Sequence, residues 1–148
     1  MNTIKALIVD DDPTALSLMS RILNRRNIEV KSYQNPVETP VYQCRNCPCS
    51  LKAKGVCPDL IISDFNMPTV NGVELLESLV GKGCRCRHLA LISGDTSSLS
   101  HYSRVAKFGT RYFTKPLDID DFYDWLDRVE LDTIQQHSRP PLKPSSGA

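Results

Sequence analysis

The chain has 148 residues, of which 41% are hydrophobic and 24% are charged, and its formal net charge is +1 at pH 7. This length and composition are typical of one soluble globular domain with a sizeable core. The near-zero net charge favours neither nucleic acid nor an acidic membrane as a partner, and no apolar run approaches the ~20 residues that a membrane helix needs. We see no secretory signal and therefore expect a cytoplasmic location.

The first predicted strand covers residues 4–9 and ends in three consecutive aspartates. Neighbouring carboxylates repel one another unless a cation or a basic side chain compensates them. Alternatively, Asp12 caps a helix that begins at Pro13, and the other two aspartates are merely solvated. A cap needs only one aspartate, so our first hypothesis is a cation site formed by Asp11 and one neighbour.

A second run, Leu60 to Ile62, is apolar throughout and lies between Pro58 and the breakers Asn66 and Pro68. Such a run is typical of a strand buried on both faces of a parallel sheet. Asp64 ends it. Because ligands of open α/β sheets bind at the carboxyl ends of strands, Asp64 is a candidate for chemistry, although it could also simply start a turn.

The other elements follow from hydrophobic periodicity and from helix and turn signals. Helices are predicted over residues 14–26, 36–43, 72–79, 97–108 and 118–131, and strands over 28–33, 88–93 and 111–114. Five strands that alternate with helices predict an α/β domain with a parallel sheet over residues 1–131. The polar, proline-rich end of the chain predicts a disordered tail over residues 132–148.

Polar side chains follow four of these strands. They are Asp10, Asp11 and Asp12 after the first, Asp64 after the third, Ser93 after the fourth and Lys115 after the fifth. Carboxylates, a hydroxyl and a lysine at one edge of a sheet predict a site for Mg²⁺ and a phosphoryl group. Together with Gly72, Tyr112 and Pro116, this pattern resembles the receiver domain of two-component response regulators, of the single-domain type.

The resemblance implies a flavodoxin-like (βα)5 fold with strand order 2-1-3-4-5. It also implies that Asp64 accepts a phosphoryl group from a histidine kinase or a histidine phosphotransfer protein. Asp11 and Asp12 are assigned to Mg²⁺, together with Asp64 and the backbone carbonyl of Asn66. Phosphoryl transfer depends mostly on positioning and charge neutralisation, which a divalent ion supplies.

The resemblance also implies a conformational switch. Lys115 would pair with the phosphoryl oxygens and Ser93 would hydrogen-bond to one of them. The inward movement of Ser93 would let Tyr112 rotate and repack the surface of the fourth helix, fifth strand and fifth helix. Alternatively, Tyr112 is a half-buried strand aromatic that never switches.

A cysteine-rich insertion over residues 44–57, between strands two and three, departs from the family pattern. The six cysteines are Cys44, Cys47, Cys49, Cys57, Cys84 and Cys86. Topology places all six near the end of the sheet opposite Asp64. We expect four of them to bind a structural Zn²⁺. Unligated thiols, a redox or disulfide role and an iron–sulfur cluster remain open alternatives.

The main interpretation is therefore a receiver that is not an enzyme and that acts by binding a downstream target protein or by passing the phosphoryl group onward. It could also form a homodimer through its fourth helix, and it could be a fragment of a longer regulator. One rival is a cysteine-based metal or redox sensor on a receiver scaffold. Another is a small phosphohydrolase that uses Asp64. Asn66 argues against it, because such enzymes typically have a second aspartate two residues after the nucleophile.

Overall fold

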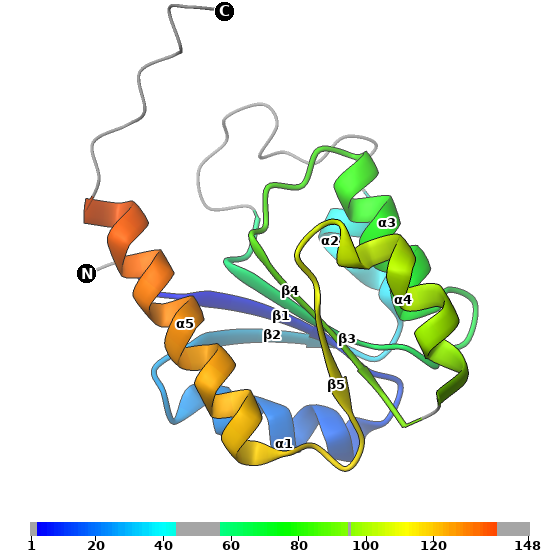
Figure 1. The fold of residues 1–148 in the computed structure, drawn as a ribbon, viewed down its shortest axis with the longest axis horizontal. Helices are drawn as coiled ribbons and strands as arrows, with labels where there is room; N and C mark the ends of the chain where they lie inside the picture. Colours follow the sequence, from blue (N-terminus) through cyan, green and yellow to red (C-terminus); the bar gives the residue numbers. More distant parts are fainter. Residues whose placement is uncertain (1–2, 44–56, 95, 139–148) are drawn as a thin grey trace, which may run out of the picture.

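The computed structural model describes residues 3–43, 57–94 and 96–138. Its parallel strands are β1 (Lys5–Val9), β2 (Glu29–Tyr33), β3 (Leu60–Asp64), β4 (His88–Ser93) and β5 (Arg111–Thr114). They form a five-stranded sheet in the order β2-β1-β3-β4-β5 (Figure 1). This confirms the predicted flavodoxin-like order. The insertion lies between β2 and β3, as expected, and its residues 44–56 fall outside the described part of the chain.

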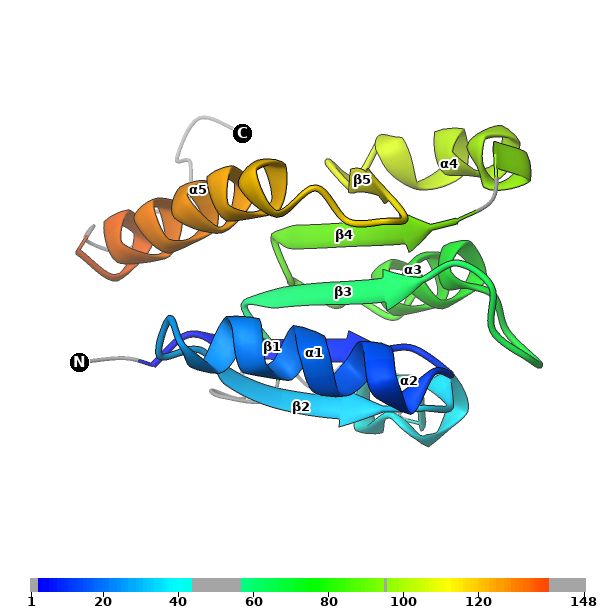
Figure 2. The same ribbon diagram turned by 90° about the horizontal axis from the view of Figure 1, so that it is seen from below.

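Helices cover both faces of the sheet in two layers (Figures 1 and 2). The α-helices are α1 (Pro13–Asn24), α2 (Pro40–Gln43), α3 (Gly72–Gly81), α4 (Leu99–Ala106) and α5 (Ile119–Ser138), and two 3₁₀ turns are η1 (Pro36–Glu38) and η3 (Thr96–Ser98). α1 and α5 pack on one face, while α2, α3 and α4 pack on the other. None of the described helices is long and apolar enough to cross a membrane.

The alternation of side chains along each strand produces two cores. Ala6 and Ile8 of β1 face α1 and α5, while Leu7 and Val9 face the other layer. Every residue of β3 is buried, which explains why its sequence is apolar from Leu60 to Ile62 rather than alternating. β3 thus holds Asp64 at the end of the best-packed strand of the sheet.

Two predicted helices are interrupted. Residues 36–43 form η1 followed by α2, because Pro40 lacks the N–H needed to continue the first turn and starts a new one. The segment predicted as a helix over 97–108 consists of η3 followed by α4. It ends before Gly109, whose φ of 77° is the left-handed conformation that stops a helix.

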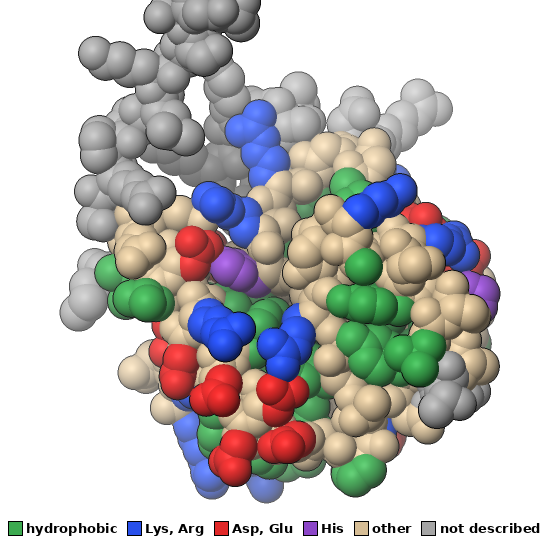
Figure 3. Space-filling model, viewed as in Figure 1, with side chains coloured by type: hydrophobic (Ala, Val, Ile, Leu, Met, Phe, Trp, Pro, Cys, Tyr) green, Lys and Arg blue, Asp and Glu red, His purple; other side chains and the backbone are tan. Residues whose placement is uncertain are grey.

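The last helix is longer than the sequence pattern indicates. α5 continues past Leu131 to Ser138, so the start of the predicted disordered tail is helical; residues 139–148 lie outside the described part. Contacts with the sheet hold this extension, because Asp132 pairs with His88 of β4 at 2.8 Å. Figure 3 shows mixed acidic and basic side chains where α5 meets solvent, as expected for the outer face of a surface helix.

Candidate functional site

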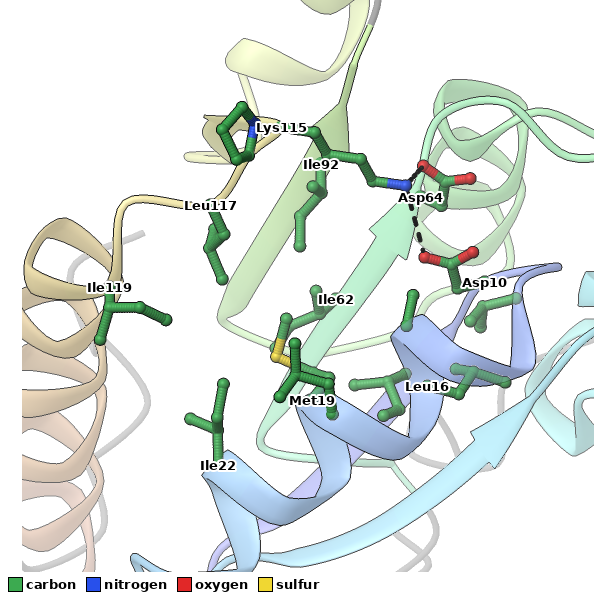
Figure 4. Close-up of a pocket in the computed structure, with 15 residues that line it drawn as sticks. Asp10, Leu16, Met19, Ile22, Ile62, Asp64, Ile92, Lys115, Leu117 and Ile119 are labelled. Carbon is green, nitrogen blue, oxygen red and sulfur yellow. Dashed lines mark ion pairs between the residues drawn. The ribbon is translucent and has the colours of Figure 1, made fainter.

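The parallel register brings the carboxyl ends of β1, β3, β4 and β5 to one edge of the sheet. Val9 pairs with Ser63, Asp64 with Ile92, and Ser93 with Thr114. The residues that follow these strands therefore meet at this edge, as the sequence predicts. Figure 4 shows Asp10, Asp64 and Lys115 converging there from three different strand ends.

An acidic cluster is formed by Asp10, Asp11 and Asp64. One carboxylate oxygen of each lies within 4.8 Å of the others. Asp64 is buried with 6% of its surface exposed, Asp10 is half-buried, and Asp11 is exposed. The cluster is thus open to solvent on one side and closed on the other.

Asp12, which the resemblance assigns to Mg²⁺, does not belong to this cluster. Its carboxylate accepts a hydrogen bond of 3.0 Å from the backbone N–H of Thr14 and caps α1. Its own N–H donates to the carboxylate of Asp10 at 2.9 Å. Pro13 in the first turn of α1 was the sequence signal, since it makes the preceding residue the cap. Asp10, rather than Asp12, lies in the cluster with Asp11 and Asp64.

Lys115 follows β5 and reaches across to the acidic residues. Its Nζ lies 3.0 Å from Oδ1 of Asp64 and 3.6 Å from Oδ2 of Asp10, as the dashed lines in Figure 4 mark. The backbone positions it, because the N–H of Lys115 donates to the carbonyl of Ser93 at 2.9 Å. The predicted meeting of Asp64 and Lys115 is therefore present.

Burial dominates the electrostatics of the site. It raises the pKa of Asp64, against the hydrogen bond from Lys115, and the nearby charge of Asp10 raises it further. Burial likewise raises the pKa of Asp10. Burial lowers the pKa of Lys115, because it disfavours the charged ammonium group. The hydrogen bond to Asp64 and the negative charge of Asp64 outweigh this effect, so the pKa of Lys115 is raised. Three carboxylates and one ammonium group leave two negative charges in excess, which suits a divalent cation.

Three further predicted residues lie on segments that start or end at the same edge of the sheet. Ser93 ends β4 and is 1% exposed, while Asn66 is exposed in the loop after β3. Gly72 begins α3, and its N–H donates to the carbonyl of Phe65 at 2.9 Å. A Cβ at Gly72 would clash with the backbone oxygen of Asp64. Only glycine therefore allows α3 to approach the site this closely.

Tyr112 of β5 is half-buried on the side of the sheet covered by α4. Its hydroxyl is 2.7 Å from the hydroxyl of Ser98, and its ring meets that of Tyr102 edge to face, with centroids 5.3 Å apart. The ring thus has a polar partner at the start of α4 and an aromatic partner within it.

A largely apolar cavity of about 470 Å³ lies between α1 and α5 and has Asp64 and Lys115 in its wall (Figure 4). Its apolar lining includes Leu18, Met19 and Ile119. Leu18 and Ile119 are 59% and 40% exposed. Sequence reasoning missed this feature, because it depends on how two distant helices meet.

The described cysteines lie at the opposite end of the sheet. Cys57 precedes β3, and Cys84 and Cys86 precede β4. The Sγ atoms of Cys57 and Cys84 are 3.8 Å apart, while Cys86 points its Sγ at the carbonyl of His88, at 3.6 Å. For these three residues the predicted position away from Asp64 is confirmed. Cys44, Cys47 and Cys49 lie outside the described residues.

Comparison with known proteins agrees with this geometry. Residues 6–127 match the family of response regulator receiver domains. The chain is 26% identical over 134 residues to the two-component response regulator EHD1 of Oryza sativa subsp. indica. It is 29% identical over 143 residues to a protein-glutamate methylesterase/protein-glutamine glutaminase of Agrobacterium fabrum. Each match covers 90% of this chain but 36% of the relative, so the chain spans about a third of their length.

Solved structures share the fold. A response regulator receiver protein from Pseudomonas putida aligns with a TM-score of 0.70 at 19% identity, over 86% of this chain and 98% of that one. The chemotaxis protein CheY4 of Vibrio cholerae aligns with a TM-score of 0.65 at 23% identity, over 86% and 99%. The sheet and its acidic edge thus define a signalling domain of the two-component class. The chain belongs to the response regulator receiver domain family, as the sequence pattern predicted.

Proposed function

We propose that Asp64 accepts a phosphoryl group from the phosphohistidine of a histidine kinase or a histidine phosphotransfer protein. The observation that carries this is the buried Asp64 carboxylate, 3.0 Å from Lys115 and beside two more carboxylates. A carboxylate oxygen of Asp64 attacks phosphorus, and an O–P bond forms as the P–N bond breaks. The imidazole keeps the electron pair of that bond and takes up a proton.

Mg²⁺ fits the donor set, because Asp10, Asp11 and Asp64 offer only oxygen ligands and an excess of negative charge. These three residues would hold the ion, with the backbone carbonyl of Asn66 as a further donor. The ion would neutralise charge on the phosphoryl oxygens. Lys115 supplies a second positive charge beside Asp64.

The direct test is the intact mass of the full chain after incubation with Mg²⁺ and acetyl phosphate. We expect a phosphate-sized increase that is absent in Asp64→Asn and strongly reduced in Asp10→Asn. Asp12→Asn is the matched control, because asparagine caps a helix as well as aspartate. No increase in the folded wild-type protein would refute the proposal, and equal losses in Asp10→Asn and Asp12→Asn would refute the revised metal assignment.

The phosphodonor docks, in this proposal, on the apolar surface between α1 and α5. A protein that delivers a phosphoryl group to Asp64 must cover the surface beside it. That surface is formed by the exposed side chains of Leu18 and Ile119, which line the same cavity as Asp64. Exposed apolar residues next to a reactive group are typical of a protein-binding site.

The output is a change in binding to a target protein through α4, β5 and α5. A hydrogen bond from the buried Ser93 hydroxyl to the phosphoryl group would draw Ser93 towards Asp64. Tyr112 would then exchange its hydrogen bond with Ser98 for a position nearer β4. Since the chain spans about a third of the length of its curated relatives, the activities of those whole proteins are not assigned to it. A cytoplasmic location remains an expectation that suits this role.

A further inference from the structure

We propose that Cys57 and Cys84 form a reversible disulfide when the protein is exposed to a peroxide, at the end of the sheet opposite Asp64. Their Sγ atoms are 3.8 Å apart, which is close to van der Waals contact between two sulfurs. Both side chains are half-buried, which leaves them accessible to a molecule as small as hydrogen peroxide. A disulfide needs two thiols and no further residue, so this pair is sufficient for it. The inference is independent of phosphoryl transfer.

The end of α3 positions Cys84. The N–H of Cys84 donates to the carbonyl of Leu79 at 3.0 Å, and the N–H of Gly83 donates to that of Val80 at 3.0 Å. This is a Schellman motif, with Gly83 in the left-handed conformation at φ 87°. Cys84 is therefore attached to the hydrogen-bonded end of a helix.

The backbone beside β1 positions Cys57. Two residues later, the N–H of Asp59 donates to the carbonyl of Lys5 at 2.7 Å, and the carboxylate of Asp59 accepts from the N–H of Lys5 at 2.8 Å. These bonds fix the start of β3. The two sulfurs thus come from separate elements, 27 positions apart in the sequence, that the fold brings together.

The sheet sets the distance over which the bond must form. Leu60 and His88 are paired in the parallel register, so the segments that lead into β3 and β4 are held side by side. Sulfurs in a disulfide are about 2.05 Å apart, so the two Sγ atoms must approach each other by about 1.8 Å. Since the strands are fixed, rotation of the two side chains has to provide this approach.

The reaction has two steps. The thiolate of one cysteine attacks an oxygen of hydrogen peroxide, the O–O bond breaks, and a sulfenic acid and one water form. The second thiol then attacks the sulfenic sulfur, the S–O bond breaks as the S–S bond forms, and a second water leaves. Two thiols are oxidised to one disulfide, and one peroxide is reduced to two waters.

The bond would close a covalent loop that runs through β3 and α3 and contains Asp64. Closing such a loop restricts the unfolded chain, so the oxidised protein should unfold at a higher urea concentration than the reduced protein. In a reducing compartment a disulfide of this kind is transient and depends on the supply of oxidant. The pair would therefore respond to exposure of the protein to peroxide.

The test uses the full chain, reduced with dithiothreitol, desalted and treated with about one equivalent of hydrogen peroxide. We expect Cys57 linked to Cys84 as the main crosslink in peptide mass spectrometry, and dithiothreitol should reverse it. Cys86→Ser is the matched control and should form the same crosslink, because the Sγ of Cys86 faces the carbonyl of His88. Cys57→Ser and Cys84→Ser should instead accumulate a dimedone-reactive sulfenic acid on the remaining partner. Both residues still reduced, or linked mainly to other cysteines, would overturn the proposal.

Unfolding the wild-type protein provides a control that does not depend on the variants. In concentrated urea the fold no longer brings Cys57 to Cys84, so crosslinks between cysteines close in the sequence should prevail. The same distribution of crosslinks in the folded and unfolded protein would refute a pair positioned by the fold. An unchanged or lower urea midpoint of the crosslinked protein would likewise contradict it.

Discussion

The ammonium group of Lys115 lies between two carboxylates, 3.0 Å from Asp64 and 3.6 Å from Asp10. Lys115 therefore competes with a divalent cation for these oxygens, yet it also supplies charge to a phosphoryl group. We expect Lys115→Gln to lower the rate of phosphorylation by acetyl phosphate about 100-fold, since it removes a positioned cation. Its affinity for Mg²⁺, measured by calorimetry, should not fall. Lys107→Gln, on the exposed end of α4, is the control and should change neither quantity.

Asp10 should destabilise the metal-free protein at neutral pH. Its raised pKa means that the folded state disfavours the ionised carboxylate, so this cost is present at pH 7 and disappears as the pH falls through the pKa. We expect Asp10→Asn to unfold at a higher urea concentration than wild type at pH 7, with the difference shrinking towards pH 4. Asp124→Asn, on the exposed side of α5, should show no such trend.

Mg²⁺ should make the wild-type protein more stable than Asp10→Asn, which reverses the order expected without metal. Wild type gains stability from binding the ion, whereas Asp10→Asn lacks one ligand and gains less. Urea unfolding at pH 7 with and without Mg²⁺ measures both effects in one series. A variant that is less stable than wild type without metal would contradict the burial argument for Asp10.

Comparing a protein phosphodonor with acetyl phosphate distinguishes docking on the apolar surface between α1 and α5 from the chemical step at Asp64. Leu18→Asp should slow phosphorylation by a phosphohistidine-bearing protein at least tenfold and leave the rate with acetyl phosphate unchanged. Leu131→Asp is a matched control, since Leu131 is 57% exposed and Leu18 is 59% exposed. Leu131 lies in the second half of α5, more than three turns after Ile119. Equal effects of the two variants would exclude docking at this cavity.

Gly72 and Gly81, both in α3, make a second matched pair. A Cβ at Gly72 would lie 2.6 Å from Leu91 and would also meet the backbone of Asp64, whereas nothing lies within 4 Å of a Cβ at Gly81. Gly72→Ala should lower the free energy of unfolding by about 1–3 kcal/mol and slow phosphorylation, because overpacking displaces the site. Gly81→Ala should raise stability by up to about 1 kcal/mol. Urea unfolding measures the stability of each variant, and the intact-mass assay measures its rate of phosphorylation.

Local sequence patterns predict β4 and β5 with their observed bounds, because each is a short apolar or aromatic run between clear breakers. The meeting of Asp64 with Lys115 also follows from sequence, since parallel strands end at one edge. The choice among Asp10, Asp11 and Asp12 required the helix cap at Asp12 to be weighed against the metal site. The extension of α5 could not be predicted, because its pair with His88 joins residues far apart in the chain.

β3 has five residues between the start of the sheet and Asp64, a length of roughly 17 Å. All five residues are buried, so salt screens charges less along this strand than it does between exposed groups. Cys57 comes shortly before this strand, and Asp64 is its last residue. A displacement of the start of β3 would be transmitted along the strand to Asp64, because the parallel neighbours β1 and β4 hold β3 on both sides. One buried strand thus connects the candidate phosphorylation site to the opposite end of the sheet.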